Sequence, residues 1–515
     1  MSGVFRSPHG LFACQQEGVA FGYARSGLLI ADTGLGKSVM AMAIAALFKE
    51  DHAAHLVLLV CKNNKTSEWA EDFDTFTSLT HRLHHGSARM KHLTRDGLPD
   101  VLISTYETLR ADLAQFTVPP GRRTKRAEDG ALLHCLLSAL ADGRRITVIY
   151  DEVSDKLRNR SSALYKAHAH ALTRLRTVQP DLRVIGLTAT PLSQGYEDAF
   201  NVLRLLVPDA MPTIGTFTSI VIKARDDYGR PRYRPEGVDA FLKLARPHFW
   251  RKRKTDPDVQ ELFPAKIEEF RTVTMGDAQD ALYRAVAELQ QPGEPAVPGL
   301  HVALRQIAAY PAALIQSARH GSSHLATQLV DTMGEETLRQ VPSAKADELV
   351  SYLAPIIHAQ GDKAVVFSFF GPSVLPLLAE VLRKEGIRSH LYHAAMTDAE
   401  RDTARTAFRA DTGACVFLTS DAGKDGINLP EASYVIEYES ATTFETRVQR
   451  FGRIDRVTST APCITCTTLV LRETVEEDLV GAMLARNEMT DHLLGDTGAK
   501  GHRTAWERRA AFVRS

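Results

Sequence analysis

The chain has 515 residues, of which 44% are hydrophobic and 24% charged, and its 62 Lys and Arg residues balance 62 Asp and Glu residues. This composition predicts about three well-packed domains and excludes a disordered chain. Because the net charge is zero, a nucleic-acid-binding surface would have to be a local basic cluster. The longest apolar stretch, residues 39–48, is about half a membrane span, and no signal peptide is apparent. We therefore expect a soluble, intracellular protein.

Residues 1–207 alternate short apolar runs with helical patterns. Strands are predicted at residues 28–31, 56–60, 101–104, 147–150 and 184–187. Apolar runs separated by helices are typical of a parallel sheet that is covered on both faces. Residues 1–207 are therefore predicted to form an α/β lobe.

The pattern changes after Pro208. Residues 208–340 are mostly helical, with proline-rich breaks near residues 290–298, and a second alternation then predicts strands at 364–367, 389–392, 416–418 and 434–437. The predicted fold class is α/β, with two parallel-sheet lobes at 1–207 and 341–480, a helical insertion with a linker at 208–340, and a helical tail at 481–515.

A glycine-rich turn follows the first predicted strand and opens a helix. In Gly34-Leu35-Gly36-Lys37-Ser38, the two glycines allow backbone N–H groups to approach phosphate oxygens, and the helix N-terminus favours an anion. Lys37 would reach the β- and γ-phosphates and Ser38 would bind Mg²⁺, so the turn predicts a P-loop for ATP.

Two carboxylates end the predicted strand at 147–150. Asp151 would hold Mg²⁺, and Glu152 would orient and deprotonate the attacking water. A surface turn could also place two acids here, but the P-loop upstream favours the catalytic interpretation. Of the six cysteines, only Cys463 and Cys466 have metal-like spacing, and without a second pair they are interpreted as structural residues.

The order of these motifs resembles that of superfamily-two helicase-like ATPases, and within them the Swi/Snf-type DNA translocases, over residues 8 to 480. The segments that carry the resemblance are 11–19, 31–38, 60–61 with Trp69, 103–109, 151–159, 187–192, 251–254 with 262–264, 365–370, 419–429, 449–456 and 474–477. The resemblance implies two RecA-like lobes that hydrolyse ATP with Mg²⁺ and move along nucleic acid, above all double-stranded DNA. A monomer is expected.

The resemblance also implies roles for single residues. It makes Arg453 and Arg456 the arginine fingers that complete catalysis, although a solvent-exposed helix carrying both arginines would be a plain alternative. The remaining roles are adenine recognition by Gln15, nucleotide binding by Asp425, nucleic-acid contacts by Thr105, Ser368 and Thr419, and coupling of hydrolysis to movement by Thr188, Thr190 and Gln449.

Several positions depart from the Swi/Snf pattern. Ser154 stands where the family more often has a histidine that helps coupling, Lys62 replaces a proline, and residues 440–443 and 457–459 differ around the arginine motif. These departures leave room for a strand-separating DNA or RNA helicase. A third alternative is an ATP-gated clamp that binds DNA without cycling, against which the intact Lys37 and Glu152 speak. Because nothing before Gln15 could hold a reader domain, we expect a bare motor like those found in bacterial or viral proteins. Its expected location is the cytoplasm of a prokaryotic cell or a viral host cell.

Overall fold

The computed structural model of the chain describes residues 3–6, 10–117, 126–191, 195–225, 231–291, 295–321, 323–421, 427–456 and 459–494. Contacts between Cα atoms divide it into two compact units. Unit 1 holds the described residues up to Gln260 together with 486–494, and unit 2 holds Glu261–Ala485. Each unit is considered by itself.

Unit 1 is built on a seven-stranded sheet whose neighbouring strands are all parallel. In spatial order the strands are β11 (Phe249–Lys252), β1 (Gly27–Ala31), β8 (Arg183–Thr188), β7 (Arg145–Asp151), β2 (His55–Cys61), β4 (Val101–Thr105) and β3 (His81–His84). Every residue of β1, β2 and β4 is buried, as expected for strands covered on both faces. All five predicted strands are confirmed, whereas β3 and β11 were not predicted.

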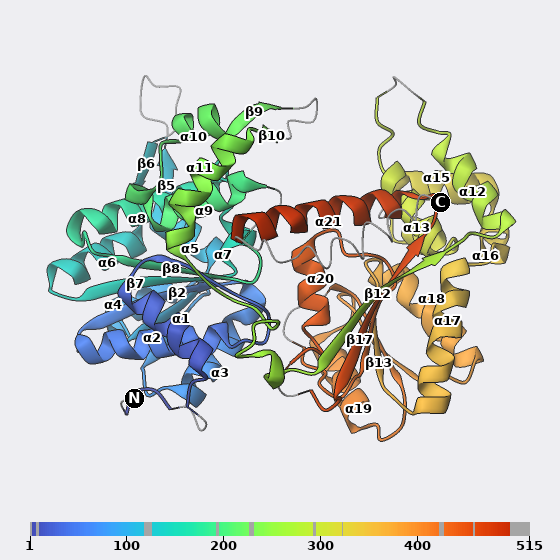
Figure 1. Ribbon diagram of the computed structural model, residues 1–515, viewed down its shortest axis with the longest axis horizontal. Coiled ribbons are helices and arrows are strands. Elements are labelled where there is room, and N and C mark those ends of the chain that lie inside the picture. The colour runs from blue at the N-terminus through green and yellow to red at the C-terminus, as the bar shows by residue number, and fades with distance from the viewer. Residues whose placement is uncertain are drawn as a thin grey trace. The chain divides into compact units, whose positions relative to one another are not determined.

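Helices cover both faces of this sheet, with α1, α2 and α3 below it and α5, α6 and α8 above it in Figure 1. The helices of unit 1 are α1 (Ala13–Ala24), α2 (Lys37–Asp51), α3 (Thr66–Phe76), α4 (Arg89–Asp96), α5 (Tyr106–Leu113), α6 (Ala131–Ala141), α7 (Val153–Lys156), α8 (Ala163–Val178), α9 (Tyr196–Leu206), α10 (Ile214–Val221) and α11 (Pro235–Ala245). Two antiparallel pairs complete the unit, β5 (Ala114–Thr117) with β6 (Arg126–Asp129) and β9 (Ile222–Arg225) with β10 (Pro231–Tyr233).

Unit 2 contains a six-stranded sheet that is also parallel throughout. Its order is β12 (Ala265–Val273), β17 (Cys463–Leu471), β16 (Tyr434–Glu437), β13 (Ala364–Phe367), β15 (Val416–Thr419) and β14 (Ser389–Tyr392). One face packs on apolar residues of α17 (Ala344–Ala354) and α18 (Gly371–Lys384), and the other packs on Phe408, Phe451 and Ile454. The four strands predicted for this lobe are confirmed, and with them the fold class of two RecA-like α/β lobes.

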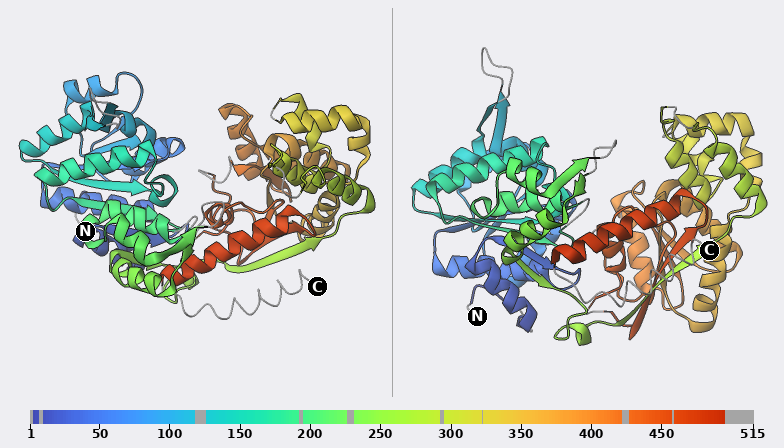
Figure 2. Two further views of the ribbon diagram at one scale, coloured as in Figure 1. Left: turned by 90° about the horizontal axis from the view of Figure 1, so that it is seen from above. Right: turned by 45° about the horizontal axis from the view of Figure 1, so that its top comes forward.

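One cluster of helices in unit 2 packs around Leu304, Leu314 and Leu338. The other helices of unit 2 are α12 (Asp277–Ala287), α13 (Leu300–Ala309), α14 (Ala313–Arg319), α15 (His324–Met333), α16 (Glu335–Gln340), α19 (Asp398–Ala410) and α20 (Phe444–Phe451), and a π-helical segment at Pro355–Gln360 follows α17. Helix α21 (Val475–Leu494) begins in unit 2, and its residues 486–494 belong to unit 1. The views in Figure 2 show this cluster beside the second sheet.

Residues 208–340, predicted as one helical insertion, are shared between the units and also contain strands. β11 extends the first sheet, β12 extends the second, and the division between the units falls at residues 260 and 261. Short, charged strands such as Phe249–Lys252 lack the continuous apolar run that marked the others. The predicted tail likewise begins inside a helix, because α21 starts at Val475.

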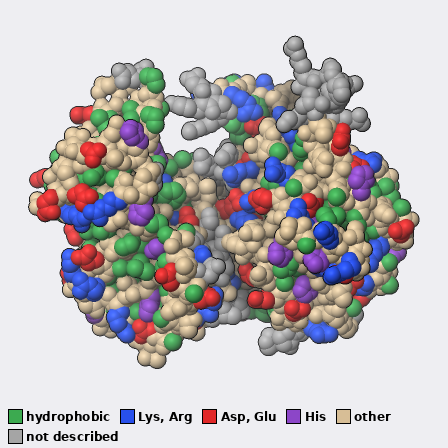
Figure 3. All heavy atoms as spheres, turned by 180° about the vertical axis from the view of Figure 1, so that it is seen from behind, with side chains coloured by type: hydrophobic (Ala, Val, Ile, Leu, Met, Phe, Trp, Pro, Cys, Tyr) green, Lys and Arg blue, Asp and Glu red, His purple; other side chains and the backbone are tan. Residues whose placement is uncertain are grey.

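Basic side chains form small separate groups among acidic ones on the face shown in Figure 3, consistent with the zero net charge. Among the described residues, no helix has the length and apolar character that crossing a membrane requires.

Candidate active site

The predicted P-loop connects β1 to α2, as the sequence indicated. Gly34 and Gly36 adopt φ angles of 89° and 78°, in the left-handed region that favours glycine. A Cβ atom on Gly36 would lie 2.4 Å from Nε2 of Gln15, so a side chain there would also displace its neighbour. The loop can therefore present backbone N–H groups at the start of α2, where Lys37 and Ser38 are the first two residues.

Gln15 lies on α1 and contacts the P-loop directly. Its Nε2 donates to the carbonyl oxygen of Leu35 at 3.2 Å, and its Oε1 accepts from the N–H of Phe12 at 3.1 Å. The side chain is 7% exposed. The structure thus brings Gln15 to the loop, and its part in adenine recognition stays a prediction.

Lys37 makes its hydrogen bond to backbone within the loop. Its Nζ donates to the carbonyl oxygen of Ala31 at 2.8 Å. Burial lowers the pKa of Lys37, and Glu152 and Asp151 oppose this shift. The ammonium group is therefore held beside two carboxylates.

Asp151 ends β7 and is held by two aromatic side chains. Nε1 of Trp69, on α3, donates to its Oδ2 at 3.0 Å, and the hydroxyl of Tyr106, at the start of α5, donates to its backbone oxygen at 2.7 Å. Trp69 and Tyr106 lie in segments that carry the family resemblance, but their bonds to Asp151 were not predicted, because the two donors come from other elements of the sheet layer. They fix the direction of the carboxylate, as second-sphere partners do at metal sites.

Glu152 has the most unusual environment of the predicted residues. Its φ of 51° is one of two positive values found for non-glycine residues in the described chain. Its Oε2 is sealed from solvent with no hydrogen-bond partner among the described residues. Burial raises the pKa of this carboxyl, and Lys37 opposes that rise. A strained backbone and an unpaired carboxylate cost stability, and both cluster at active sites.

The predicted coupling segment follows β8. The hydroxyl of Thr188 donates to the backbone oxygen of Thr190 at 3.0 Å and accepts from its N–H at 3.1 Å, which closes a tight turn. The hydroxyls of Thr190 and of Ser154 are buried without a partner among the described residues. This side of the P-loop therefore carries several unsatisfied polar groups.

In unit 2 the predicted arginines lie beyond a helix, not on one. α20 ends at Phe451, so the alternative of an exposed helix carrying both side chains is wrong. Arg453 is 6% exposed and donates to the backbone oxygens of Gln449 at 2.9 Å and Ile427 at 3.1 Å. Nε of Arg456 donates to the backbone oxygen of Gly452 at 2.9 Å.

The three residues predicted to contact nucleic acid are all buried. Thr105 is 4% exposed and caps α5 by accepting from the N–H of Thr108 at 3.1 Å. Ser368 and Thr419 are 0% and 1% exposed, and their hydroxyls donate to Glu439 and to the backbone of Ser420. Their nucleic-acid contacts stay predictions. Asp425 lies outside the described residues.

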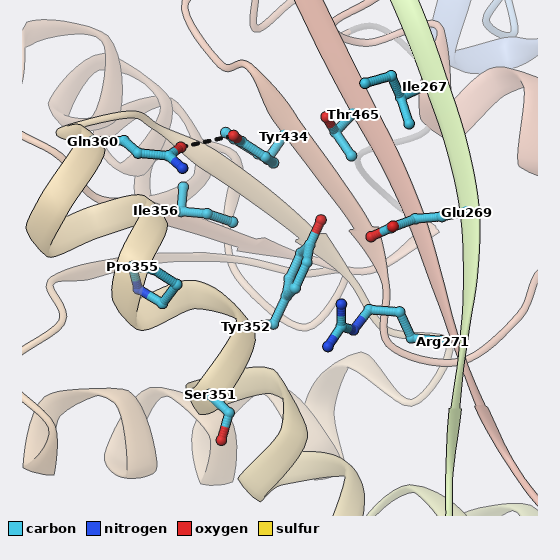
Figure 4. Close-up of a pocket in the computed structure, with 10 residues that line it drawn as sticks. All are labelled: Ile267, Glu269, Arg271, Ser351, Tyr352, Pro355, Ile356, Gln360, Tyr434 and Thr465. Carbon is cyan, nitrogen blue, oxygen red and sulfur yellow. Dashed lines mark hydrogen bonds between the residues drawn. The ribbon is translucent and has the colours of Figure 1, made fainter.

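A pocket of about 430 Å³ in unit 2 lies between β12 and the end of α17. Figure 4 shows Tyr352 standing in its middle, with the hydroxyl of Tyr434 donating to Gln360 at 2.7 Å. None of the predicted site residues lines it. Cys463 and Cys466 differ in exposure on β17, the first exposed and the second buried, in agreement with a structural interpretation.

Comparison with protein families assigns both units. Residues 14–333 match the SNF2-related domain. The chain belongs to the SNF2-related family. Residues 344–458 of this SNF2-related chain match the helicase conserved C-terminal domain. The family resemblance inferred from the motifs is thereby confirmed.

Curated relatives of the SNF2-related chain include chromatin-remodelling proteins. Protein CHROMATIN REMODELING 4 of Arabidopsis thaliana is 26% identical over 473 residues, which cover 88% of this chain and 19% of that protein. The CHD3-type chromatin-remodeling factor CHR7 of the same plant is 22% identical over 493 residues, covering 91% and 36%. The chain thus spans well under half the length of these relatives.

Solved structures support the fold. The Hef helicase domain of Pyrococcus furiosus aligns with a TM-score of 0.55 at 16% identity, covering 93% of this chain and 99% of that one. The likeness supports the two-lobed helicase fold and nothing finer.

Proposed function

We propose that the chain is an ATP-driven motor that translocates along double-stranded DNA with little sequence specificity. The observation that carries the proposal is Lys37 at the start of α2, where the charges of Glu152 and Asp151 act on it, beside a glycine-rich loop at the ends of parallel strands. Ligands of parallel α/β sheets bind at such strand ends. The SNF2-related family supports the choice of duplex DNA as the track.

The residues of unit 1 fit ATP with Mg²⁺. Backbone N–H groups of the loop and the Lys37 ammonium would hold the phosphates, while Ser38 and Asp151 would bind the ion, which neutralises charge on the phosphate oxygens. The unpaired Oε2 of Glu152 is available to accept a proton from the attacking water. Its raised pKa makes it a stronger base than an exposed carboxylate.

Completion of the site would require cations from unit 2. The transition state places charge on the γ-phosphoryl oxygens, and Arg453 and Arg456 would meet it. Their guanidinium groups donate to backbone carbonyls that could be exchanged for phosphate oxygens. Hydrolysis would then depend on the two units closing together, which DNA bound to both would favour.

ATP hydrolysis measured with a panel of nucleic acids tests this function. We expect blunt duplex DNA to stimulate turnover far more than single-stranded DNA or RNA, with a steep dependence on salt because backbone phosphates are contacted. Preference for a single strand would favour the helicase alternative. Hydrolysis that no nucleic acid stimulates would contradict the proposal.

A further inference from the structure

The two hydroxyls predicted to contact DNA at the carboxyl end of the second sheet are buried. Ser368 follows β13 and Thr419 ends β15, but both hydroxyls are sealed and bonded within the unit. A motor that alternates its hold on the duplex needs phosphate-binding groups on this unit too. Another described side chain near these strand ends is therefore a candidate to supply them.

Arg305 is such a side chain. It lies on α13, is 5% exposed, and has its guanidinium carbon 4.3 Å from the ring centroid of Phe369 and 5.4 Å from that of Phe370. Phe369 is itself 40% exposed. These two rings directly follow Ser368, so the guanidinium lies at the carboxyl end of β13.

The guanidinium of Arg305 forms no hydrogen bond or ion pair with any residue that the structure describes, and its Nε is sealed from solvent. An arginine carries five N–H donors and stays charged, so leaving it buried without an acceptor is costly. Burial lowers the pKa of Arg305, and Glu439 and Glu476 oppose this shift.

The carboxylates nearby are committed to other donors. Glu439 accepts from the hydroxyl of Ser368 at 3.1 Å and from the N–H of Phe369 at 2.9 Å. Glu476 accepts from Lys345 at 2.8 Å, and Asp421 pairs with Arg450 at 2.8 Å. They balance the charge of Arg305 at longer range but leave its donors unused.

We propose that Arg305 binds a backbone phosphate of the DNA track, with Phe369 as the apolar surface beside it. The inference rests on the proposed function and names a contact within it. The planar fork of a guanidinium matches two phosphate oxygens, which gives Arg an advantage over hydroxyl groups at such sites. An exposed aromatic ring next to the fork can contact a sugar or base.

The salt dependence of duplex binding tests this assignment. Arg305→Met keeps the length and apolar packing of the side chain but removes its charge and donors. We expect the slope of log affinity against log salt to become shallower by about 0.9, with about tenfold weaker binding near 0.1 M salt. Arg319→Met is the matched control, because this exposed arginine pairs with Glu335 on the surface and should leave the slope unchanged.

The possible results test the DNA contact of Arg305 and the proposed motor function separately. Duplex-stimulated hydrolysis in the wild type together with an unchanged slope in Arg305→Met would overturn only the Arg305 assignment, whereas unstimulated wild-type hydrolysis would overturn the motor. A matching loss of ATP affinity without DNA would assign the guanidinium to the nucleotide and also overturn the contact. Should Arg305→Met not fold, Arg305→Lys retains the cation. It should keep the slope but bind the duplex more weakly, and wild-type affinity would contradict the proposal.

Discussion

The polar groups beside the P-loop of unit 1 and the ion pairs at the strand ends of unit 2 are buried in different ways. Around the P-loop of unit 1, Glu152, Ser154 and Thr190 each leave a buried oxygen without a partner among the described residues. In unit 2, Glu437 is fully buried but bonds to Arg447 and Arg450, and Lys345 pairs with Glu476. The groups beside the P-loop therefore stay unsatisfied where a reaction can use them, whereas these buried ion pairs hold strand ends of unit 2 in place.

This difference indicates where each unit's activity would come from. Unsatisfied buried groups cost stability and are retained where a ligand can satisfy them. Paired groups instead fix geometry. Arg305 departs from these pairs, because its buried Nε has no hydrogen-bond partner among the described residues. Substitutions at the two kinds of group should consequently have effects of different kinds.

The largest effect is expected at Arg453. Replacing it with alanine should reduce DNA-stimulated ATP turnover by about 10³- to 10⁵-fold, because Arg456 alone would then have to meet the charge on the γ-phosphoryl oxygens. ATP binding, measured with a fluorescent analogue, should be spared. Arg319→Ala serves as the surface control. Equal turnover in the Arg453 variant would defeat the idea that unit 2 completes the site.

Substitutions in unit 1 should separate phosphate binding from proton transfer. Lys37→Ala should abolish hydrolysis by weakening the hold on the phosphates.

Glu152→Gln should lower turnover by about 10²- to 10⁴-fold while ATP still binds, since the amide cannot accept the proton from water. Single-turnover kinetics measure the rate of the hydrolysis step. Glu107→Gln, which changes an exposed carboxylate paired with Lys156, is the control. Wild-type behaviour of Glu152→Gln in every assay would favour the non-cycling clamp.

Acidification should weaken unit 1 more than unit 2. Burial lowers the pKa of His55 and of His168 to about 4, from an ordinary value of 6.5. The folded form resists protonation, so its stability is complete above pH 6.5 and falls as the pH drops toward 4. Each histidine should cost about 2 kcal/mol by pH 5.

Unit 2 should resist this change better. Burial alone would raise the pKa of Glu268, but Lys266 and Arg447 lower it to about 2, below the range in question. His301 and His393 shift in the same direction as the unit 1 histidines, by amounts that are not large. Hydrogen exchange resolved by mass spectrometry measures the protection of backbone amides in both units in one experiment. Equal loss of protection in the two units at pH 5 would contradict the prediction.

The smallest effect is expected at Ser154. Because its buried hydroxyl has no hydrogen-bond partner within the described part of the chain, Ser154→Ala should raise the free energy of unfolding by about 1 kcal/mol and keep ATP hydrolysis. Ser162 is a matched control, since its hydroxyl caps α8 by accepting from Tyr165 at 3.1 Å. Ser162→Ala should lose about 1 kcal/mol in chemical denaturation. Destabilisation by Ser154→Ala would show that this hydroxyl has a partner.

The sequence predicted best those site residues that neighbouring segments of the chain position. Gly36, Lys37 and Asp151 were predicted because a strand, a turn and a helix place them without help from distant residues. The bonds of Trp69 and Tyr106 to Asp151 join segments more than forty positions apart, so no periodicity reveals them. β12 was missed because its edge position leaves it half exposed, without a strong apolar signal. For Arg305, the available hint was an arginine among the apolar residues of α13.

Displacement of a third strand from a DNA triplex tests the central claim most directly, because it reports movement along a duplex. The wild-type chain should release the third strand when ATP is added and leave the underlying duplex paired, and Glu152→Gln should release none. Hydrolysis of ATP without release, or release accompanied by separation of the duplex strands, would contradict translocation along double-stranded DNA.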